Sequence, residues 1–148
     1  MAIQAAVSLS NDKDAYRAGY GAAKTAMQKL GGAKPDFMFV FSSVSFEQDK
    51  LLQGVREATD DAPLIGCSDA GEITAEGSFQ KSAVVMAIKT DQMTFFTGLG
   101  KDIKNGDFQA GEAVAREVKD KAKENLKAFV MLPDVLTGNG AEIVRGVL

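Results

Sequence analysis

The sequence contains no histidine and only one cysteine, Cys67. Without histidine the chain cannot form a Ser-His-Asp triad, a Cys-His catalytic pair or a histidine-ligated haem, and most zinc sites also need this residue. A single cysteine cannot form an internal disulfide, so nothing in the composition indicates an oxidising compartment. No metal ligands and no cofactor are therefore expected.

Long apolar runs and a strong net charge are also missing. The N-terminal segment has neither the basic region nor the apolar stretch of a signal peptide or a membrane span. The formal net charge is -3 at pH 7, which does not provide the clustered positive charge that binds nucleic acid. The sequence predicts a cytoplasmic protein whose partners include neither nucleic acid nor a membrane.

The length and composition are those of an ordinary globular protein. The chain has 148 residues, of which 45% are hydrophobic and 25% charged. A domain of this size buries roughly 68–70% of the surface that its unfolded chain exposes, so a hydrophobic core can form. We expect a single domain over residues 1–148.

Apolar residues alternate between patterns typical of strands and of helices. Helices are expected from the caps at residues 10–12 to about 30, from 45 to about 59, from about 107 to 122, and from 141. Strands are expected at 3–8, 37–41, 64–66, 83–88, 93–97 and 128–132, with 83–88 and 93–97 joined as a hairpin. This order predicts an α/β fold with a mixed, mostly parallel sheet and helices on its faces.

The strand at 37–41, the helix that follows and the strand at 64–66 form a βαβ unit. Ser45 and Gln48 have the spacing of a capping box, which predicts the start of the helix. The two strands should run parallel through a right-handed crossover, so their carboxyl ends lie at one edge of the sheet. Ligands of open α/β sheets bind at such an edge, and a shared crevice is predicted for Ser42, Ser43, Cys67 and Ser68.

The stretch PLIGCSDAGEITAEG at residues 63–77 combines several candidate site residues. Gly66 suits a close approach of the backbone, and Gly71 suits a turn with positive φ. Asp69 and Glu72 would serve acid/base chemistry or an ammonium group of a ligand, or would simply cap turns. Cys67 is interpreted as a pocket wall, because no histidine and no nearby cation is present to form a thiolate.

The late stretch LTGNG offers a second group of candidates, Asp134, Gly138 and Asn139. Its backbone N–H groups could bind a carboxylate or a phosphate, and a turn with an N-cap is the structural alternative. The strand expected just before it should end at the same sheet edge as Cys67. Apolar residues up to Leu148 then suggest that the chain is truncated at its C-terminal side, or that a partner covers this end.

The segments PDFMFVFSS, PLIGCSDAGEI, AVVMAI and LPDVLTGNG together resemble the N-terminal part of FIST domains. The resemblance implies a sensory module of a bacterial signal-transduction protein that binds a small ligand, with amino acids among the candidates. It also implies a C-terminal FIST half or an output domain as partner. Some members are reported to bind haem, which the absence of histidine argues against here.

The predicted function is therefore small-molecule sensing without catalysis, with a homodimer as a further possible assembly. The alternatives are an enzyme that uses Cys67 with a nearby carboxylate, and a non-catalytic interaction module that docks through its apolar C-terminus. No catalytic residue is predicted. The predicted ligand-binding residues are Ser42, Ser43, Cys67, Ser68, Asp69, Gly71, Glu72, Asp134, Gly138 and Asn139.

Overall fold

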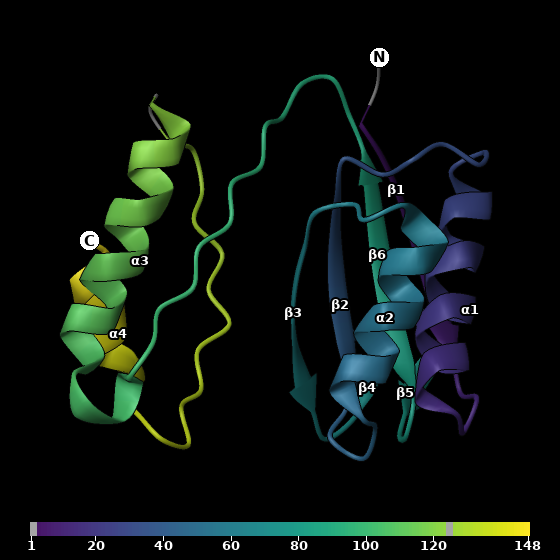
Figure 1. The fold of residues 1–148 in the computed structure, drawn as a ribbon, viewed down its shortest axis with the longest axis horizontal. Helices are drawn as coiled ribbons and strands as arrows, with labels where there is room; N and C mark the ends of the chain where they lie inside the picture. Colours follow the sequence, from purple (N-terminus) through teal and green to yellow (C-terminus); the bar gives the residue numbers. More distant parts are fainter. Residues whose placement is uncertain (1–2, 124–125) are drawn as a thin grey trace. The chain divides into compact units, whose positions relative to one another are not determined.

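The computed structural model describes residues 3–123 and 126–148, which form two compact units. The first unit extends to Phe95 and the second runs from Phe96 to Leu148 (Figure 1). The single domain expected over residues 1–148 stays a prediction beside this division, and each unit is described by itself. No helix in the described ranges is long and apolar enough to cross a membrane.

The first unit is built on a four-stranded sheet in the order β1-β6-β2-β3. Its strands are β1 (Gln4–Ser10), β2 (Phe37–Ser43), β3 (Leu64–Asp69) and β6 (Ala83–Lys89). The α/β class and the mixed sheet are confirmed. Parallel pairing, however, is confined to β2 and β3, because β6 lies between β1 and β2 and is antiparallel to both.

Two helices, α1 (Ala15–Lys29) and α2 (Gln48–Thr59), pack on one face of this sheet (Figure 1). Small residues bring the two helices close together. A Cβ added at Gly19 would lie 2.1 Å from the carbonyl oxygen of Leu51, and one at Gly54 would lie 2.2 Å from that of Tyr16. The core between helices and sheet is formed by Ala6, Ala18, Ala22, Met38, Val40, Leu51, Val55, Val85 and Ala87.

The hairpin expected between residues 83–88 and 93–97 is wrong. Both hydrogen-bonding edges of β6 are occupied, by β1 on one side and by β2 on the other, so no edge remains for a strand at 93–97. The chain instead leaves the sheet after Lys89, and Phe95 stacks on Phe37 with ring centroids 4.6 Å apart. A small hairpin of β4 (Glu72–Thr74) and β5 (Gly77–Phe79) precedes β6.

The second unit contains a short 3-10 helix η1 (Ile103–Asn105), α3 (Asp107–Ala122) and α4 (Gly140–Val147). The two α-helices pack closely at glycines, since a Cβ at Gly111 would lie 2.2 Å from the carbonyl oxygen of Ile143. The strand expected at 128–132 is wrong. The described part of this unit contains no strand with which that segment could pair.

Two of the predicted helix starts also need correction. Helix α1 is capped by Asp14, whose side chain accepts a hydrogen bond from the Arg17 N–H, and not by residues 10–12. The N-cap of α2 is Glu47, which makes no side-chain cap bond, so the capping box of Ser45 and Gln48 is wrong. The cap predicted for α4 is confirmed, because Asn139 accepts the Ala141 N–H at 3.0 Å.

Candidate functional site

The carboxyl ends of β2 and β3 lie side by side, as the βαβ pattern predicts. In the parallel register Ser42 is paired with Ser68, and Ser43 is paired with Asp69. The next strand contributes as well, because the Ser43 N–H donates to the carbonyl oxygen of Ser82 at 3.0 Å. We refer to Ser42, Ser43, Ser68, Asp69, Glu72 and Ser82 as the rim.

The rim is not the single crevice that the sequence predicts. Strand β3 continues to Asp69, so Cys67 and Ser68 lie within the strand and not beyond its end. Successive residues of a strand point to opposite faces. Ser68 therefore lies on the same face as Ser42, whereas Cys67 lies on the opposite face together with Ser43 and Asp69.

The serines at the end of β2 are buried and hydrogen-bonded. Ser42 Oγ donates to Gln48 Oε1 at 2.8 Å, and Gln48 Nε2 donates to the carbonyl oxygen of Ser43 at 3.0 Å. Ser43 Oγ lies 2.9 Å from Ser45 Oγ. These contacts hold the end of β2 against the start of α2, so Ser42 and Ser43 support the rim and are themselves buried. Among the serines of the rim, Ser68 is the one exposed to solvent.

Glu72 is a buried carboxyl group at the start of the β4–β5 hairpin. Only 3% of the residue is exposed, and Ser82 Oγ donates a hydrogen bond to its Oε2. Its other oxygen, Oε1, is buried and has no hydrogen-bond partner among the described residues. A buried carboxylate oxygen without a hydrogen-bond donor is costly, so this atom can accept a donor group placed close to it.

Asp69 lies beside this buried group and is half-buried itself. Its Oδ1 accepts the Gly71 N–H at 3.1 Å, which forms the turn between β3 and β4. Burial raises the pKa of the Asp69 carboxyl above its ordinary value, and the charge of Glu72 raises this pKa further. The two carboxyl groups therefore form an interacting pair.

The glycines of the stretch act through close packing. A Cβ at Gly66 would lie 1.9 Å from the Val40 carbonyl oxygen, which confirms the predicted close approach of the backbone. The positive φ expected at Gly71 is wrong, since Gly71 is not among the residues with positive φ. Its side chain is excluded by space instead, because a Cβ would lie 2.8 Å from the Phe79 carbonyl oxygen.

Cys67 is an exposed free cysteine on the outer strand of the sheet. The pKa of its thiol is raised, first by partial removal of water and then by the negative charge of Asp69. A raised pKa lowers the fraction of thiolate at neutral pH, which is the opposite of what a nucleophilic cysteine requires. The residue is exposed, and its interpretation as a pocket wall stays a prediction.

The late group of candidates belongs to the second unit. Asp134 accepts the Leu136 N–H and the Thr137 hydroxyl, which makes it the centre of a turn. Asn139 caps α4, and Gly138 leaves no room for a side chain beside Asp107 and Ile103. Each residue thus has a structural role in its own unit, and a role in ligand binding stays a prediction.

The sequence did not identify the role of Gln48, which contacts the rim, or of the rim residue Ser82. Gln48 was interpreted as half of a capping box, although its amide holds the end of β2. Ser82 directly precedes the apolar strand β6 and belongs to no motif. Only the antiparallel register of β6 beside β2 could have placed Ser82 next to Ser43.

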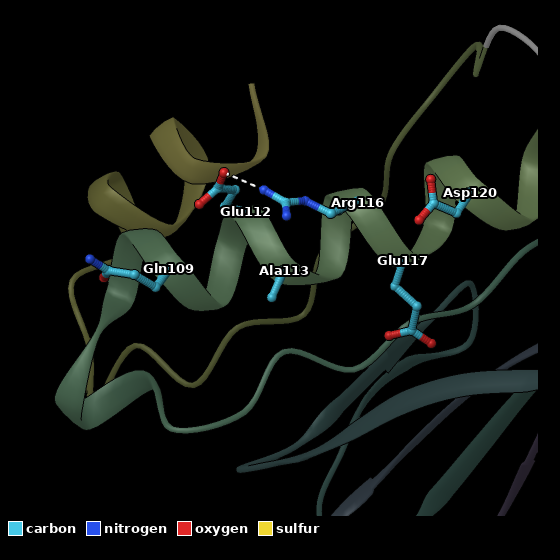
Figure 2. A pocket seen from close by; sticks show the side chains of 6 residues that line it. All are labelled: Gln109, Glu112, Ala113, Arg116, Glu117 and Asp120. Atoms are coloured by element: carbon cyan, nitrogen blue, oxygen red, sulfur yellow. Dashed lines mark hydrogen bonds and ion pairs between the residues drawn. The ribbon is translucent and has the colours of Figure 1, made fainter.

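A surface hollow of about 370 Å³ lies on α3, far along the sequence from the rim residues. Its six lining side chains, Gln109, Glu112, Ala113, Arg116, Glu117 and Asp120, all come from this one helix (Figure 2). Glu112 and Arg116 form an ion pair of 2.8 Å across one helical turn. A single helix does not enclose a ligand, and we do not regard this hollow as the binding site.

Within the described residues no group of three or more His, Cys, Asp or Glu side chains could hold a metal ion.

The model of the FIST N domain matches residues 36–148. The chain belongs to the FIST N domain family. This family is associated with sensing in signal transduction, and the matched residues include the whole rim as well as the late loop. No curated protein is significantly similar to this FIST chain.

Among solved structures, the FIST chain is similar to thiamine-monophosphate kinase from Stenotrophomonas maltophilia K279a. The identity is 18% and the TM-score 0.42, with 99% of the present chain and 49% of the kinase chain covered. The present chain thus spans about half the length of that protein. The likeness is too low to support an argument about fold or function.

Proposed function

We propose that this FIST domain is the sensory part of an intracellular bacterial signal-transduction protein and that its rim binds a small polar metabolite, with amino acids as the first candidates. The observation that carries the proposal is the buried Glu72 carboxyl, with one oxygen lacking a donor, beside Asp69 at the shared end of two parallel strands. An ammonium group placed there would supply the missing donors.

The rim divides into residues that can reach a ligand and residues that hold the site in shape. Ser68 is exposed and Asp69 half-buried, so a ligand can contact both from solvent. Ser42 and Ser43 are engaged with the start of α2 and support the strand ends. Hydroxyl and carboxylate groups in this arrangement suit a small polar molecule with a positive group.

Binding without catalysis is part of the proposal. The one candidate nucleophile, Cys67, has a raised thiol pKa, which lowers the fraction of reactive thiolate at neutral pH. The alternative of a cysteine enzyme is therefore not favoured by any observation at the site. A C-terminal FIST half, an output domain or a second copy of the chain are the proposed partners that would receive the signal.

Thermal shift measurements with amino acids and related amines test the proposal. A ligand present at 100 times its Kd stabilises the folded state by about 2.7 kcal/mol, which gives a clear, saturable rise of Tm. Ser68→Ala and Asp69→Asn should reduce this rise. Ser78→Ala, at an exposed position of β5, is the matched control and should leave it unchanged.

The proposal fails if no compound of a broad set of amino acids and amines raises Tm. It also fails if the stabilisation by a compound that does bind is the same in Ser68→Ala, Asp69→Asn and the unaltered chain. The second outcome would place the binding site outside the rim.

A further inference from the structure

The sheet of the first unit has two edges, β1 and β3, and the two edges differ. An unpaired edge is a template for a further strand, and proteins protect such edges with lysine, proline or bulges. At β1, Lys29 Nζ donates to the Val7 carbonyl oxygen at 2.7 Å, so a lysine occupies a backbone acceptor of that strand. Strand β3 has no such contact among the described residues, and its register with β2 runs without a bulge from Leu64 to Asp69 (Figure 1).

Hydrogen bonds at the two ends of β3 show which of its backbone groups face the open edge. The Met38 N–H donates to the Pro63 carbonyl oxygen at 2.9 Å, and the Val44 N–H donates to the Asp69 carbonyl oxygen at 3.1 Å. Backbone groups alternate in direction along a strand, so every second residue from Pro63 to Asp69 faces β2. The residues between them direct their N–H and C=O groups to the open edge: Leu64, Gly66 and Ser68. No hydrogen bond described outside the sheet ladders engages these groups.

The composition of β3 suits pairing with an identical strand. Gly66, Cys67 and Ser68 are small and exposed, so a second backbone can approach from the side. Asp69 is the one charged residue of the strand and lies at its end. A two-fold interface brings the same surface of both copies together, and a neutral centre avoids repulsion between like charges there.

We propose that β3 pairs antiparallel with β3 of a second copy of this chain, with the two-fold axis at Gly66, so that the two sheets become one. In this register Leu64 lies opposite the partner's Ser68, and every outward N–H and C=O group gains a hydrogen-bond partner. A register shifted along the strand leaves some of these groups unpaired. The two Asp69 carboxylates lie at opposite ends of the pair, about 20 Å apart, which is more than two Debye lengths in physiological salt.

This interface gives a surface to one of the partners named in the proposed function, the second copy of the chain. Ser68 belongs both to the rim and to the strand pair, so the partner's Leu64 lies beside the rim. Ligand binding and dimerisation are thereby coupled. The coupling rests on the proposed function, whereas the strand pairing itself needs no ligand.

Sedimentation velocity of the full chain, in the presence of a reductant and over a wide range of concentrations, tests the pairing. The chain should show a reversible equilibrium between monomer and dimer. Ser68→Pro should shift this equilibrium to the monomer, because proline removes an outward N–H and no hydrogen bond to β2. Gln4→Pro, at the first residue of the opposite edge strand, is the matched control and should leave dimerisation unchanged.

Amide hydrogen exchange measured by NMR tests the same edge in the unaltered chain. At an unpaired edge the Gly66 and Ser68 amides exchange equally fast at every concentration. In the dimer these amides exchange through the dissociated monomer, so their rates should fall about threefold for each tenfold rise in protein concentration once the dimer predominates. In Ser68→Pro the Gly66 rate should no longer depend on concentration.

Three results would overturn the proposal. The first is a monomer at all concentrations, and the second is a dimer that persists in a folded Ser68→Pro variant. The third is exchange at Gly66 and Ser68 that does not depend on concentration, and this result decides if Ser68→Pro does not fold. None of these measurements requires a ligand, so failure of the strand pairing and failure of the proposed function are distinguishable.

Discussion

The contact between α1 and α2 gives the most quantitative prediction, through the change Gly54→Ala. The added Cβ would lie 2.2 Å from the Tyr16 carbonyl oxygen and 2.8 Å from the Tyr20 nitrogen, whereas ordinary contacts begin at 3.4 Å. Both obstacles are backbone atoms, so neither can rotate away. The helices must separate by about 1 Å, and overpacking of this kind costs about 1–3 kcal/mol.

The helix propensity of alanine acts in the opposite direction. Alanine stabilises a helix interior by about 1 kcal/mol relative to glycine, so the net loss for Gly54→Ala is up to about 2 kcal/mol. Gly21 in α1 is the matched control, because a Cβ there meets only Ser10 Oγ at an ordinary 3.7 Å. Gly21→Ala should therefore stabilise the first unit by up to about 1 kcal/mol.

Urea unfolding followed by tyrosine fluorescence measures both changes. The chain has two tyrosines and no tryptophan, and Tyr16 and Tyr20 both lie in α1, so the signal reports the first unit alone. The free energy of unfolding should be lower for Gly54→Ala than for Gly21→Ala by about 1–3 kcal/mol. If Gly54→Ala is as stable as Gly21→Ala, the described packing of the two helices is incorrect.

Three further predictions concern single groups. The pKa of Asp36 is lowered, first by the hydrogen bond from the Thr90 N–H and then by Lys89, so the stability that this carboxylate provides is present above pH 3.8 and is lost as the pH falls through the lowered pKa. The unaltered chain should therefore have a higher urea midpoint than Asp36→Asn at neutral pH, and this difference should disappear in acid. A difference that stays constant with pH would contradict the prediction. Cys67 should react slowly with iodoacetamide at neutral pH, with a half-maximal rate above pH 9.0, and a midpoint below that value would contradict the raised thiol pKa. Asn139→Ala should weaken α4 by about 1 kcal/mol, seen as faster amide exchange in that helix, whereas unchanged exchange would show that the cap is dispensable.

The sequence predicted the parallel strands β2 and β3 because the residues that specify them lie close together in the chain. The continuous apolar run at 37–41 and the glycine at 66 identified the parallel pair β2 and β3 and the close approach of their backbones. The amide cap at Asn139 was predicted on the same basis. Patterns of apolar residues, glycines and caps within short stretches of the chain were sufficient to predict these elements.

The insertion of β6 between β1 and β2 could not be predicted in this way. Several apolar strands could each have paired with β2. Which strand becomes its neighbour depends on contacts between residues far apart in the chain. The wrong hairpin at 93–97 followed from this choice. Ser82 was missed for the same reason, since its role arises only from the position of β6.

The side chains of the candidate site were predicted in part. The ends of β2 and β3 meet as expected, but β3 is longer than its glycine suggested, and strand alternation then sends Cys67 and Ser68 to opposite faces. The burial of Glu72 also has no sequence signal. Glu72 accepts a hydrogen bond from Ser82, which directly precedes β6 and is distant from Glu72 in any local pattern.

Chemical-shift mapping by NMR tests the central claim most directly. The labelled full chain would be titrated with each amino acid or amine that stabilises it. The account predicts saturable shifts at residues 42–43, 68–72 and 82, with the largest changes at Ser68 and Asp69. Shifts confined to the helix surface at residues 109–120, or the absence of saturable shifts, would contradict a ligand site at the rim.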